Sequence, residues 1–442
     1  MASALLWHRI QFGFTIVYHY LFPQLTMGLG LLLVVFKALA LRTGNERYDH
    51  LARFWLRIFA VNFAVGVVTG IPMEFQFGTN WARFTKFTGS IVGQTLAMEG
   101  MFAFFLESTF LGLLVYGEKR LGPKKHFAVA CALFVGSWLS GYFIIATNAF
   151  MQHPQGHVLD AQGRLVLADV WAFVFNPWAL VAYAHNMMAS VVTASFVVTA
   201  VGAYWMLRDR HPEHRTLMLR VSLVCALVSS VLVAFPTGDR QAKMVAEHQP
   251  AALAAMEGRF TTNREAPLTL IGQPNVAERR LDNPIHVPGA LSFLAFGTFH
   301  SEVAGLDQIP PEDWPTNIEL LYYAFHVMAG LGTLMIGLTA LANLLFWRGQ
   351  LGRFRIVQWA LLLAFPAPYI ATTAGWMTTE MGRQPWLVYG LMRTADGTSP
   401  LVHTGETLFT LIGFAGLYLV VGVLYVILVG RDIGKGPVPA HG

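Results

Sequence analysis

Five side chains that can bind iron stand in, or at the end of, apolar stretches of this sequence: His19, Glu99, His185, Met328 and Glu380. Ionisable groups are unfavourable in hydrocarbon surroundings, so the acids and histidines among them mark candidate functional sites. Neutral imidazole and thioether are axial ligands of haem iron, and a His/Met pair raises the potential of a low-spin haem. A carboxylate can bind a high-spin iron. Copper prefers clustered histidines, which the apolar stretches lack, so haem is the favoured hypothesis.

Each of these residues also has a plainer interpretation. A single histidine in a membrane often only forms a packing hydrogen bond, and methionine is an ordinary core filler. Glu99 can be a neutral acid bonded to a neighbouring helix, and Glu380 can be an interfacial carboxylate paired with Arg383. The choice between these interpretations depends on whether the five residues lie at the same depth.

A second pattern concerns acids on one helix face. Glu99 and Glu107 in MEGMFAFFLEST are eight positions apart, which is about 80° around an α-helix, so they share a face. Buried acids in series are typical of proton relays. Ser140, in GSWLSGYF, is placed at a comparable depth and can continue the relay, although a membrane serine more often bonds its own helix backbone.

Long apolar segments provide the frame for these residues. The chain has 442 residues, of which 55% are hydrophobic and 12% charged, whereas a soluble protein carries about 25% charged residues. About 20 apolar residues cross a bilayer. We therefore predict an all-α, polytopic membrane protein with about nine transmembrane helices, at 14–40, 54–77, 93–117, 126–150, 179–206, 218–237, 319–346, 356–380 and 405–429.

The sequence gives no evidence for a signal peptide, a disulfide framework or a nucleic-acid partner. The first is too long for a secretory signal and lacks a small-residue cleavage site. Cys131 and Cys225 lie within apolar segments and suggest neither a disulfide framework nor a thiolate metal site. The net charge of +5 reflects the loops between the segments and does not indicate a nucleic-acid partner.

The distribution of Lys and Arg predicts the orientation. Short loops on one side of the predicted membrane carry most of these residues, and that side is cytoplasmic by the positive-inside rule. The rich segments are 42–57, 119–125, 208–220, 348–355 and 431–435. The N-terminus and the loop 239–318 then face outward, so that residues 1–442 form one membrane domain with an ordered external loop inserted. At 1.5 Å per helical residue, all five candidate ligands fall near the outer surface.

Two other functions remain open on this evidence. One is a haem-binding electron-transfer subunit whose acceptor is not oxygen. The other is a haem-free, proton-coupled transporter that uses Glu99 and Glu107, although no internal repeat typical of many transporters is visible.

Five motifs, in order along nearly the whole chain, resemble subunit I of cytochrome bd quinol oxidase in its short quinol-loop form. They are RIQFGFTIVYHYLFPQLTMGLG, GIPMEFQFGTNW, AMEGMFAFFLEST, SGYFIIATNAFMQHPQG and GWMTTEMGRQPW. The resemblance implies an enzyme of the bacterial cytoplasmic (inner) membrane that oxidises ubiquinol or menaquinol at the outer face and reduces dioxygen to water. Protons come from the cytoplasm, so a membrane potential forms without pumping. It also implies two haem b and one haem d, a subunit II as partner, and a small single-helix accessory subunit as a further candidate partner.

The resemblance assigns roles residue by residue. His19 is implied as ligand of the haem d iron with Glu99 on the opposite side, Glu380 as ligand of the high-spin haem b, and His185 with Met328 as ligands of the low-spin haem b. The remaining assignments are Arg383 and Trp376 for cofactor binding, Glu107 and Ser140 for proton transfer, and Glu257 in the quinol loop 239–318.

Two positions depart from the family pattern. In QPAALAAMEG, Glu257 matches the quinol-site glutamate, but Ala252 stands where a lysine is expected. In YYAFHVMAG, His326 stands where an arginine is expected. His326 and Met328 are two positions apart, about 200° around a helix, so both cannot face one iron. We favour Met328 as the ligand.

Overall fold

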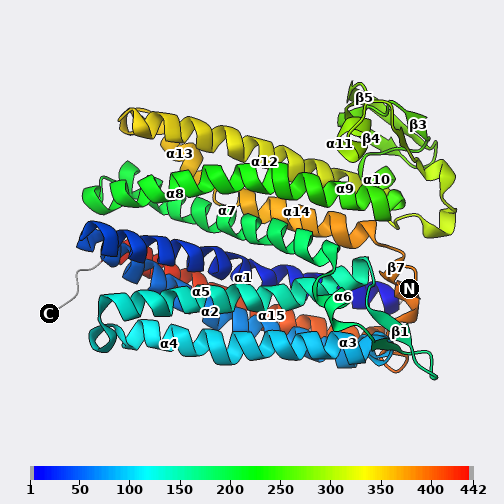
Figure 1. Cartoon of the computed structure of the whole chain (residues 1–442), viewed down its shortest axis with the longest axis horizontal. Coiled ribbons are helices and arrows are strands. Elements are labelled where there is room, and N and C mark those ends of the chain that lie inside the picture. Colours follow the sequence, from blue (N-terminus) through cyan, green and yellow to red (C-terminus); the bar gives the residue numbers. More distant parts are fainter. Residues whose placement is uncertain (1–3, 438–442) are drawn as a thin grey trace.

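Long helices dominate the computed structural model of the chain, which describes residues 4–437 (Figure 1). Six helices run for most of the bundle length, and the third of them has a kink at Gly122 near its start. They are α1 (Ala4–Thr43), α2 (Glu46–Thr79), α5 (Glu118–Gln152), α7 (Pro177–Leu207), α12 (Ile318–Trp347) and α15 (Thr404–Lys435). Together with the interrupted helices, eight candidate spans are long and apolar enough to cross a membrane, and one bent pair makes a ninth, within these described residues. The prediction of about nine transmembrane helices is confirmed.

Three spans are interrupted where the sequence pattern suggested continuous helices. One runs through α3 (Ala82–Met101), the π-helical η1 (Phe102–Glu107) and α4 (Ser108–Tyr116); another runs through α8 (Pro212–Leu232), the π-helical η2 (Val233–Gly238) and α9 (Asp239–His248). The third is bent by 40° between α13 (Arg355–Leu363) and α14 (Ala367–Gly382). Pro366 lies at this bend, where a missing N–H and a ring clash break the α-helical hydrogen bonding. Hydrophobicity alone does not reveal such breaks.

Short elements connect the spans. Four two-stranded antiparallel sheets pair β1 (His157–Leu159) with β2 (Leu165–Leu167), β3 (Asn263–Arg264) with β6 (Glu302–Val303), β4 (Leu268–Asn275) with β5 (Arg280–Val287), and β7 (Trp386–Val388) with β8 (Met392–Arg393). The short helices are α6 (Val170–Val174), α10 (Pro250–Met256) and α11 (Ala290–Phe296), with 3₁₀ turns η3 (Leu306–Gln308), η4 (Pro311–Asp313), η5 (Leu351–Arg353) and η6 (Thr394–Asp396).

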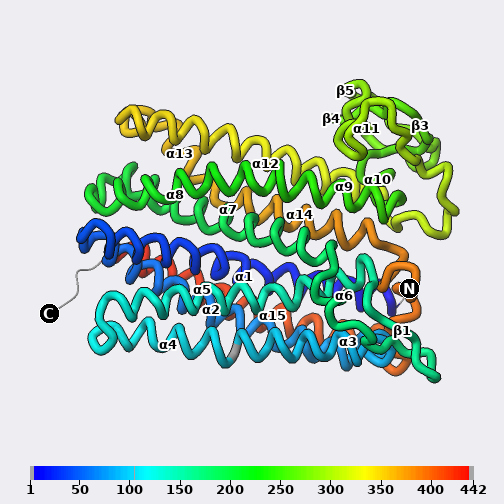
Figure 2. Tube along the Cα trace, in the orientation of Figure 1, coloured from blue at the N-terminus to red at the C-terminus, as the bar shows by residue number. Residues whose placement is uncertain are grey.

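The segment predicted as the external loop forms a lobe at one end of the bundle. Helix α9 occupies its first ten residues, and α10, α11 and the β3–β6 strands then pack around a small apolar core that includes Leu253, Phe260 and Leu306. In Figure 1 this lobe stands at the upper right, where the labels of α10, α11, β3, β4 and β5 lie together. Helix α1 begins at the same end, and α15 ends at the opposite one (Figure 2).

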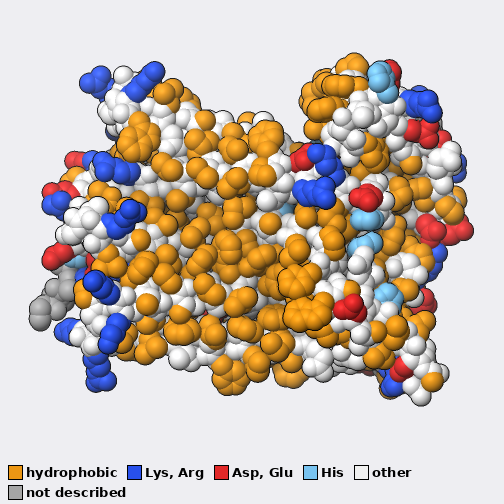
Figure 3. Space-filling view, in the orientation of Figure 1, with side chains coloured by type: hydrophobic (Ala, Val, Ile, Leu, Met, Phe, Trp, Pro, Cys, Tyr) orange, Lys and Arg blue, Asp and Glu red, His pale blue; other side chains and the backbone are white. Residues whose placement is uncertain are grey.

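The main core lies between α1, α2, α7 and α8. Phe36, Trp55, Trp205 and Met218 are fully buried there. The outside of the bundle is a broad apolar band, and Lys and Arg side chains gather at the helix ends opposite the lobe (Figure 3). An apolar belt with one cation-rich end is what a bilayer and the positive-inside rule require.

Candidate functional site

His19 is held by a threonine of the neighbouring helix. Its Nδ1 lies 3.1 Å from Oγ1 of Thr69 in α2, and that hydroxyl donates its own hydrogen to the carbonyls of Val65 and Gly66. A hydroxyl has one hydrogen, so a Thr69 hydroxyl that donates to a backbone carbonyl accepts from the imidazole. The proton of a neutral His19 therefore sits on Nδ1, and the Nε2 lone pair is left available.

His185 in α7 repeats this arrangement with different helices. Its Nδ1 lies 3.2 Å from Oγ1 of Thr237, whose hydroxyl donates to the carbonyls of Leu232 and Val233. Thr237 belongs to the π-helical turn η2, next to Pro236. Such turns are often found at functional sites because they shift side chains out of the regular helical register. The Nε2 of His185 is again left available.

Met328 and His326 point to different neighbours. A Cβ built at position 375 in α14 would lie only 2.8 Å from the Met328 sulfur, so Gly375 is what lets the thioether approach that helix. His326 instead faces the lobe: its Nδ1 lies 2.9 Å from the Tyr322 carbonyl and its Nε2 3.1 Å from the Thr269 carbonyl. Each imidazole nitrogen thus lies beside a backbone carbonyl, and a neutral ring donates to one of the two. This placement of the ring favours Met328 as the candidate iron ligand.

Glu380 lies near the end of α14 inside a set of donors. Asn148 Nδ2 and Gln152 Nε2 donate to its Oε1 at 2.7 and 3.3 Å, and Arg383 donates to both carboxylate oxygens. The Arg383 side chain is only 2% exposed, whereas that of Glu380 is 38% exposed. A buried guanidinium needs such a partner. Trp376, one turn earlier, is half-buried.

The acid series is only partly as predicted. Glu107 is buried and hydrogen-bonded to Ser137, one turn before the predicted Ser140. The segment between Glu99 and Glu107 contains the π-helical η1, so the expected 80° offset of a regular α-helix does not apply. The two acids nonetheless remain near enough for their charges to interact.

The donors in the membrane part suit porphyrin-bound iron. Ligating histidines usually donate their other ring N–H to a fixed acceptor, which is what Thr69 and Thr237 provide. Within residues 4–437, no group of three or more His, Cys, Asp or Glu side chains could enclose a bare metal ion. A haem iron needs only one or two ligands from the protein, because the four nitrogens of the porphyrin supply the rest. The residues present therefore fit haem.

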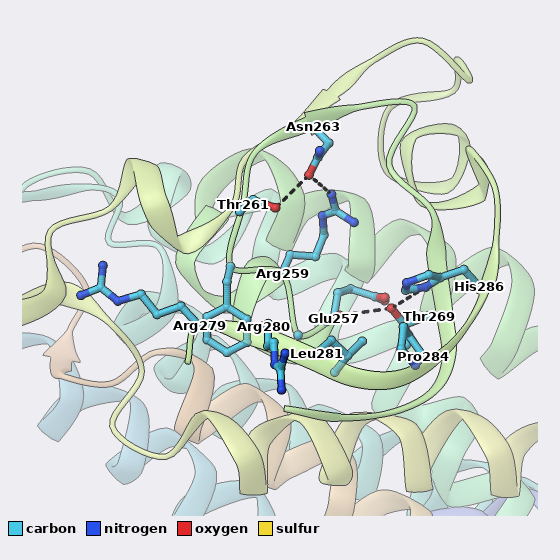
Figure 4. Close-up of a pocket in the computed structure, with 12 residues that line it drawn as sticks. Glu257, Arg259, Thr261, Asn263, Thr269, Arg279, Arg280, Leu281, Pro284 and His286 are labelled. Carbon is cyan, nitrogen blue, oxygen red and sulfur yellow. Dashed lines mark hydrogen bonds between the residues drawn. The ribbon is translucent and has the colours of Figure 1, made fainter. Parts of the chain in front are cut away.

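The lobe contains a separate cavity of about 280 Å³ around Glu257 (Figure 4). Burial raises the pKa of Glu257 to about 7, although a backbone hydrogen bond from Thr269 and the charge of Arg259 oppose this shift. The β4–β5 pairing sets Thr269 opposite His286, with Thr269 Oγ1 3.4 Å from the imidazole Nδ1. The volume is near the lower end of the range for small-molecule pockets.

Ala252, the first departure from the family pattern, is buried against α14. A Cβ at Gly382 would lie 3.1 Å from the Ala252 Cβ, so α10 and α14 touch here through small residues. A lysine side chain at this position would have to enter that contact. The alanine is therefore explained by close helix packing.

Several polar residues that complete these arrangements were not predicted from the sequence. They are Thr69, Thr237, Ser137, Asn148, Gln152 and Arg259. The available signal was weak: Asn148 and Gln152 stand in one apolar helix four positions apart, which places them on one face.

The fold and the donors define a polytopic, all-α membrane protein of the haem-binding class. A family model described as cytochrome bd terminal oxidase subunit I matches residues 7–437, and the chain belongs to that family. It is 35% identical to cytochrome bd ubiquinol oxidase subunit 1 of Bacillus subtilis, over 98% of this chain and 94% of that protein. It is 31% identical to cytochrome bd-II ubiquinol oxidase subunit 1 of Escherichia coli, over 97% and 96%.

A solved structure agrees with these relatives. The bd oxidase from Geobacillus thermodenitrificans superposes with a TM-score of 0.91 and 31% identity, covering 98% of this chain and 99% of that one. The chain is therefore a multi-pass membrane subunit of a haem-containing terminal quinol oxidase, and it acts with a partner subunit. The hypothesis of a haem-free transporter is wrong.

Proposed function

We propose that this chain carries the complete set of iron ligands of a quinol:dioxygen oxidoreductase. Two haem b and one haem d would supply electron transfer and the reduction of dioxygen to water. His19 would hold the haem d iron with Glu99 on the opposite side, Glu380 the high-spin haem b, and His185 with Met328 the low-spin haem b. The observation that carries this proposal is that Thr69 and Thr237 each lie within hydrogen-bond distance of Nδ1 of one of the two histidines, an arrangement in which Nε2 can bind iron.

The chain's own residues handle the protons. In the lobe, the buried carboxylate of Glu257 accepts a proton from quinol; two quinols give four protons and four electrons for each dioxygen reduced to two waters. A pKa near 7 suits a general base at neutral pH. On the other side, Glu107 and Glu99 pass protons outward from the cytoplasm, with the hydroxyls of Ser137 and Ser140 on the adjoining helix α5.

The proposed orientation puts the lobe and the start of α1 outside the bacterial inner membrane. The cation-rich helix ends opposite the lobe support it. Quinol protons are then released outside while water-forming protons are taken from inside, so charge is separated without a pump. Arg383 binds Glu380 here and keeps further N–H groups that suit a haem propionate. The partners are subunit II, quinol and dioxygen, with a small single-helix subunit as a further candidate.

Purified oxidase reconstituted in vesicles tests this proposal. We expect quinol-driven oxygen uptake together with a membrane potential, positive on the lobe side. Oxygen uptake without a membrane potential would overturn the proton routes. Quinol oxidation that required another electron acceptor would favour the alternative of an electron-transfer subunit that does not reduce oxygen.

A further inference from the structure

The cavity in the lobe contains two buried polar atoms of opposite character that lack a partner. They are Oε2 of Glu257 and Nε of Arg259. As whole residues, Glu257 is 2% exposed and Arg259 is 8% exposed. An unsatisfied buried polar group costs about 1–3 kcal/mol, and more when it is charged. Both residues line the cavity of about 280 Å³ (Figure 4). One cavity is thus lined by a residue with an unpartnered acceptor and by a residue with an unpartnered donor.

The two charges influence each other without forming an ion pair. Burial raises the pKa of Glu257 and lowers the pKa of Arg259, and the charge of each residue opposes the shift of the other. Yet neither Oε2 of Glu257 nor Nε of Arg259 has a hydrogen-bond partner among the residues that the structure describes. Two opposite charges that face one cavity without closing on each other leave space for a polar ligand between them.

The Arg259 guanidinium is fixed in place. Its Nη2 donates to Oδ1 of Asn263 at 2.9 Å, and Thr261 donates to the same oxygen at 3.2 Å. In Figure 4, these residues lie on the β3 side of the cavity and Glu257 lies toward Thr269 and His286. Because the Nη2 end of the guanidinium is tethered to Asn263, the side chain is held among the residues that line the cavity, and arginine stays charged at any physiological pH.

The other cations around the cavity are already engaged. Arg279 lies over the Trp314 ring, 5.3 Å from its centroid, and Arg280 pairs with Glu278 and Asp282, each at 2.8 Å. Arg280 is also 61% exposed, so water screens its charge. Position 252 is an alanine and carries no charge, and its methyl group lies close to Gly382 of α14. Arg259 is therefore the buried cation best placed to act on a ligand.

We propose that Arg259 is a catalytic residue of quinol oxidation, whose Nε–H donates to a quinol oxygen while Oε2 of Glu257 accepts a quinol hydroxyl proton. The inference rests on the proposed quinol site. In this step the quinol O–H bond breaks, the proton moves to the carboxylate, and the electron pair of that bond stays on the quinol oxygen as negative charge. A fixed guanidinium stabilises such a charge more in the transition state than in the neutral substrate. Two electrons would then pass to the haems that the proposed function assigns to this chain, and the second hydroxyl proton would leave to water, so that quinone remains.

The test compares Arg259→Gln with Arg264→Gln in the intact two-subunit oxidase. Arg264→Gln removes one positive charge from the same lobe, but the Arg264 side chain is 79% exposed and does not line the cavity. For Arg259→Gln we expect kcat/KM for quinol to fall about a hundredfold, with a shift of the acidic limb of the pH profile to higher pH. Oxygen uptake driven by tetramethyl-p-phenylenediamine, which has no hydroxyl proton to remove, should stay unchanged.

Two further variants make the result decisive. Arg259→Lys keeps the charge and should keep the pH profile; Asn263→Ala loosens the guanidinium and should raise KM several-fold. If Arg259→Gln cannot be purified with haem, a KM for quinol of Asn263→Ala equal to that of Arg264→Gln would overturn the inference. Equal quinol kinetics in Arg259→Gln and Arg264→Gln would overturn it directly. Wild-type enzyme that oxidises the diamine but no quinol would overturn the proposed quinol site and the inference with it.

Discussion

The candidate iron ligands in the membrane part and the residues of the lobe cavity differ in how their polar groups are partnered. In the membrane part, each histidine has one nitrogen bound to a threonine of a neighbouring helix and one nitrogen left available. In the lobe, residues from a helix end, strands and loops surround a cavity in which opposite charges stay apart. The first arrangement fixes a ligand's orientation, as a metal requires. The second adjusts a carboxylate's proton affinity, as a general base requires.

The largest effects are expected from the histidines. His185→Ala should remove the low-spin haem b signal, and His19→Ala the signal of haem d, with quinol-driven oxygen uptake falling to background in both. His50→Ala is the control, because His50 stacks on His214 at the other end of the bundle. Absorption spectra and extracted haem decide the outcome. Wild-type spectra for both ligand variants would refute the assignment.

Substitutions of Met328 and His326, two positions apart on α12, compare a candidate haem ligand in the membrane part with a residue that contacts the lobe. Met328→Leu should abolish the low-spin signal and leave haem d in place. His326→Ala should retain all haem, because its ring contacts the Tyr322 and Thr269 carbonyls, and should weaken only the attachment of the lobe. Optical spectra and limited proteolysis of the lobe separate the two effects. The reverse pattern would make His326 the ligand.

The pH dependence of the lobe forms the next prediction. A base must be deprotonated to accept a proton, and burial raises the pKa of Glu257 to about 7, so kcat/KM for quinol should rise with pH up to about 7 and then level. Glu257→Gln should lower kcat about 10²–10⁴-fold and abolish this acidic limb, with full haem content. Glu247→Gln, whose side chain is 72% exposed, is the control. An acidic limb retained in Glu257→Gln would assign it to another group.

Loss of an orienting hydrogen bond should have a smaller effect. Thr237→Val keeps the shape of the side chain but removes the acceptor for His185 Nδ1–H, so affinity for the haem should fall about 10–100-fold. Thr333→Val is the matched control, since Thr333 bonds only its own helix at Ala329. Haem loss during dilution or competition with apo-globin measures the difference. Equal retention in both variants would mean that Thr237 does not orient the histidine.

The smallest effect is expected at position 252. Ala252→Lys forces a long side chain into the contact with Gly382, and such overpacking destabilises by about 1–3 kcal/mol. The haem-loaded complex should therefore melt at a lower temperature, with no gain in quinol turnover. Faster turnover at unchanged stability would show that a cation at this position does reach the substrate.

The sequence predicted the membrane part better than the lobe. His19, His185 and Glu380 stand out because charge and imidazole are rare in apolar segments. Thr69 and Thr237 do not, because threonine is common in membrane helices, and the π-helical turn that positions Thr237 leaves no hydrophobic signal. Ser137 and Ser140 are one turn apart, so a relay partner for Glu107 could not be chosen between them.

In the lobe, the difficulty is of another kind. Arg259 is one arginine among several in a polar segment, and only the folded lobe shows that it is buried and lines the same cavity as Glu257. Long-range packing of this sort has no local pattern. The same holds for the contact between Ala252 and Gly382, which explains an alanine where a lysine was expected.

The haem content of the purified two-subunit oxidase, measured by extraction and pyridine haemochrome spectra, tests the central claim most directly. Our account predicts two haem b and one haem d in the wild type, and one haem b fewer in His185→Ala. A wild-type preparation that oxidises quinol with fewer haems, or a His185→Ala variant with an unchanged haem content, would contradict it.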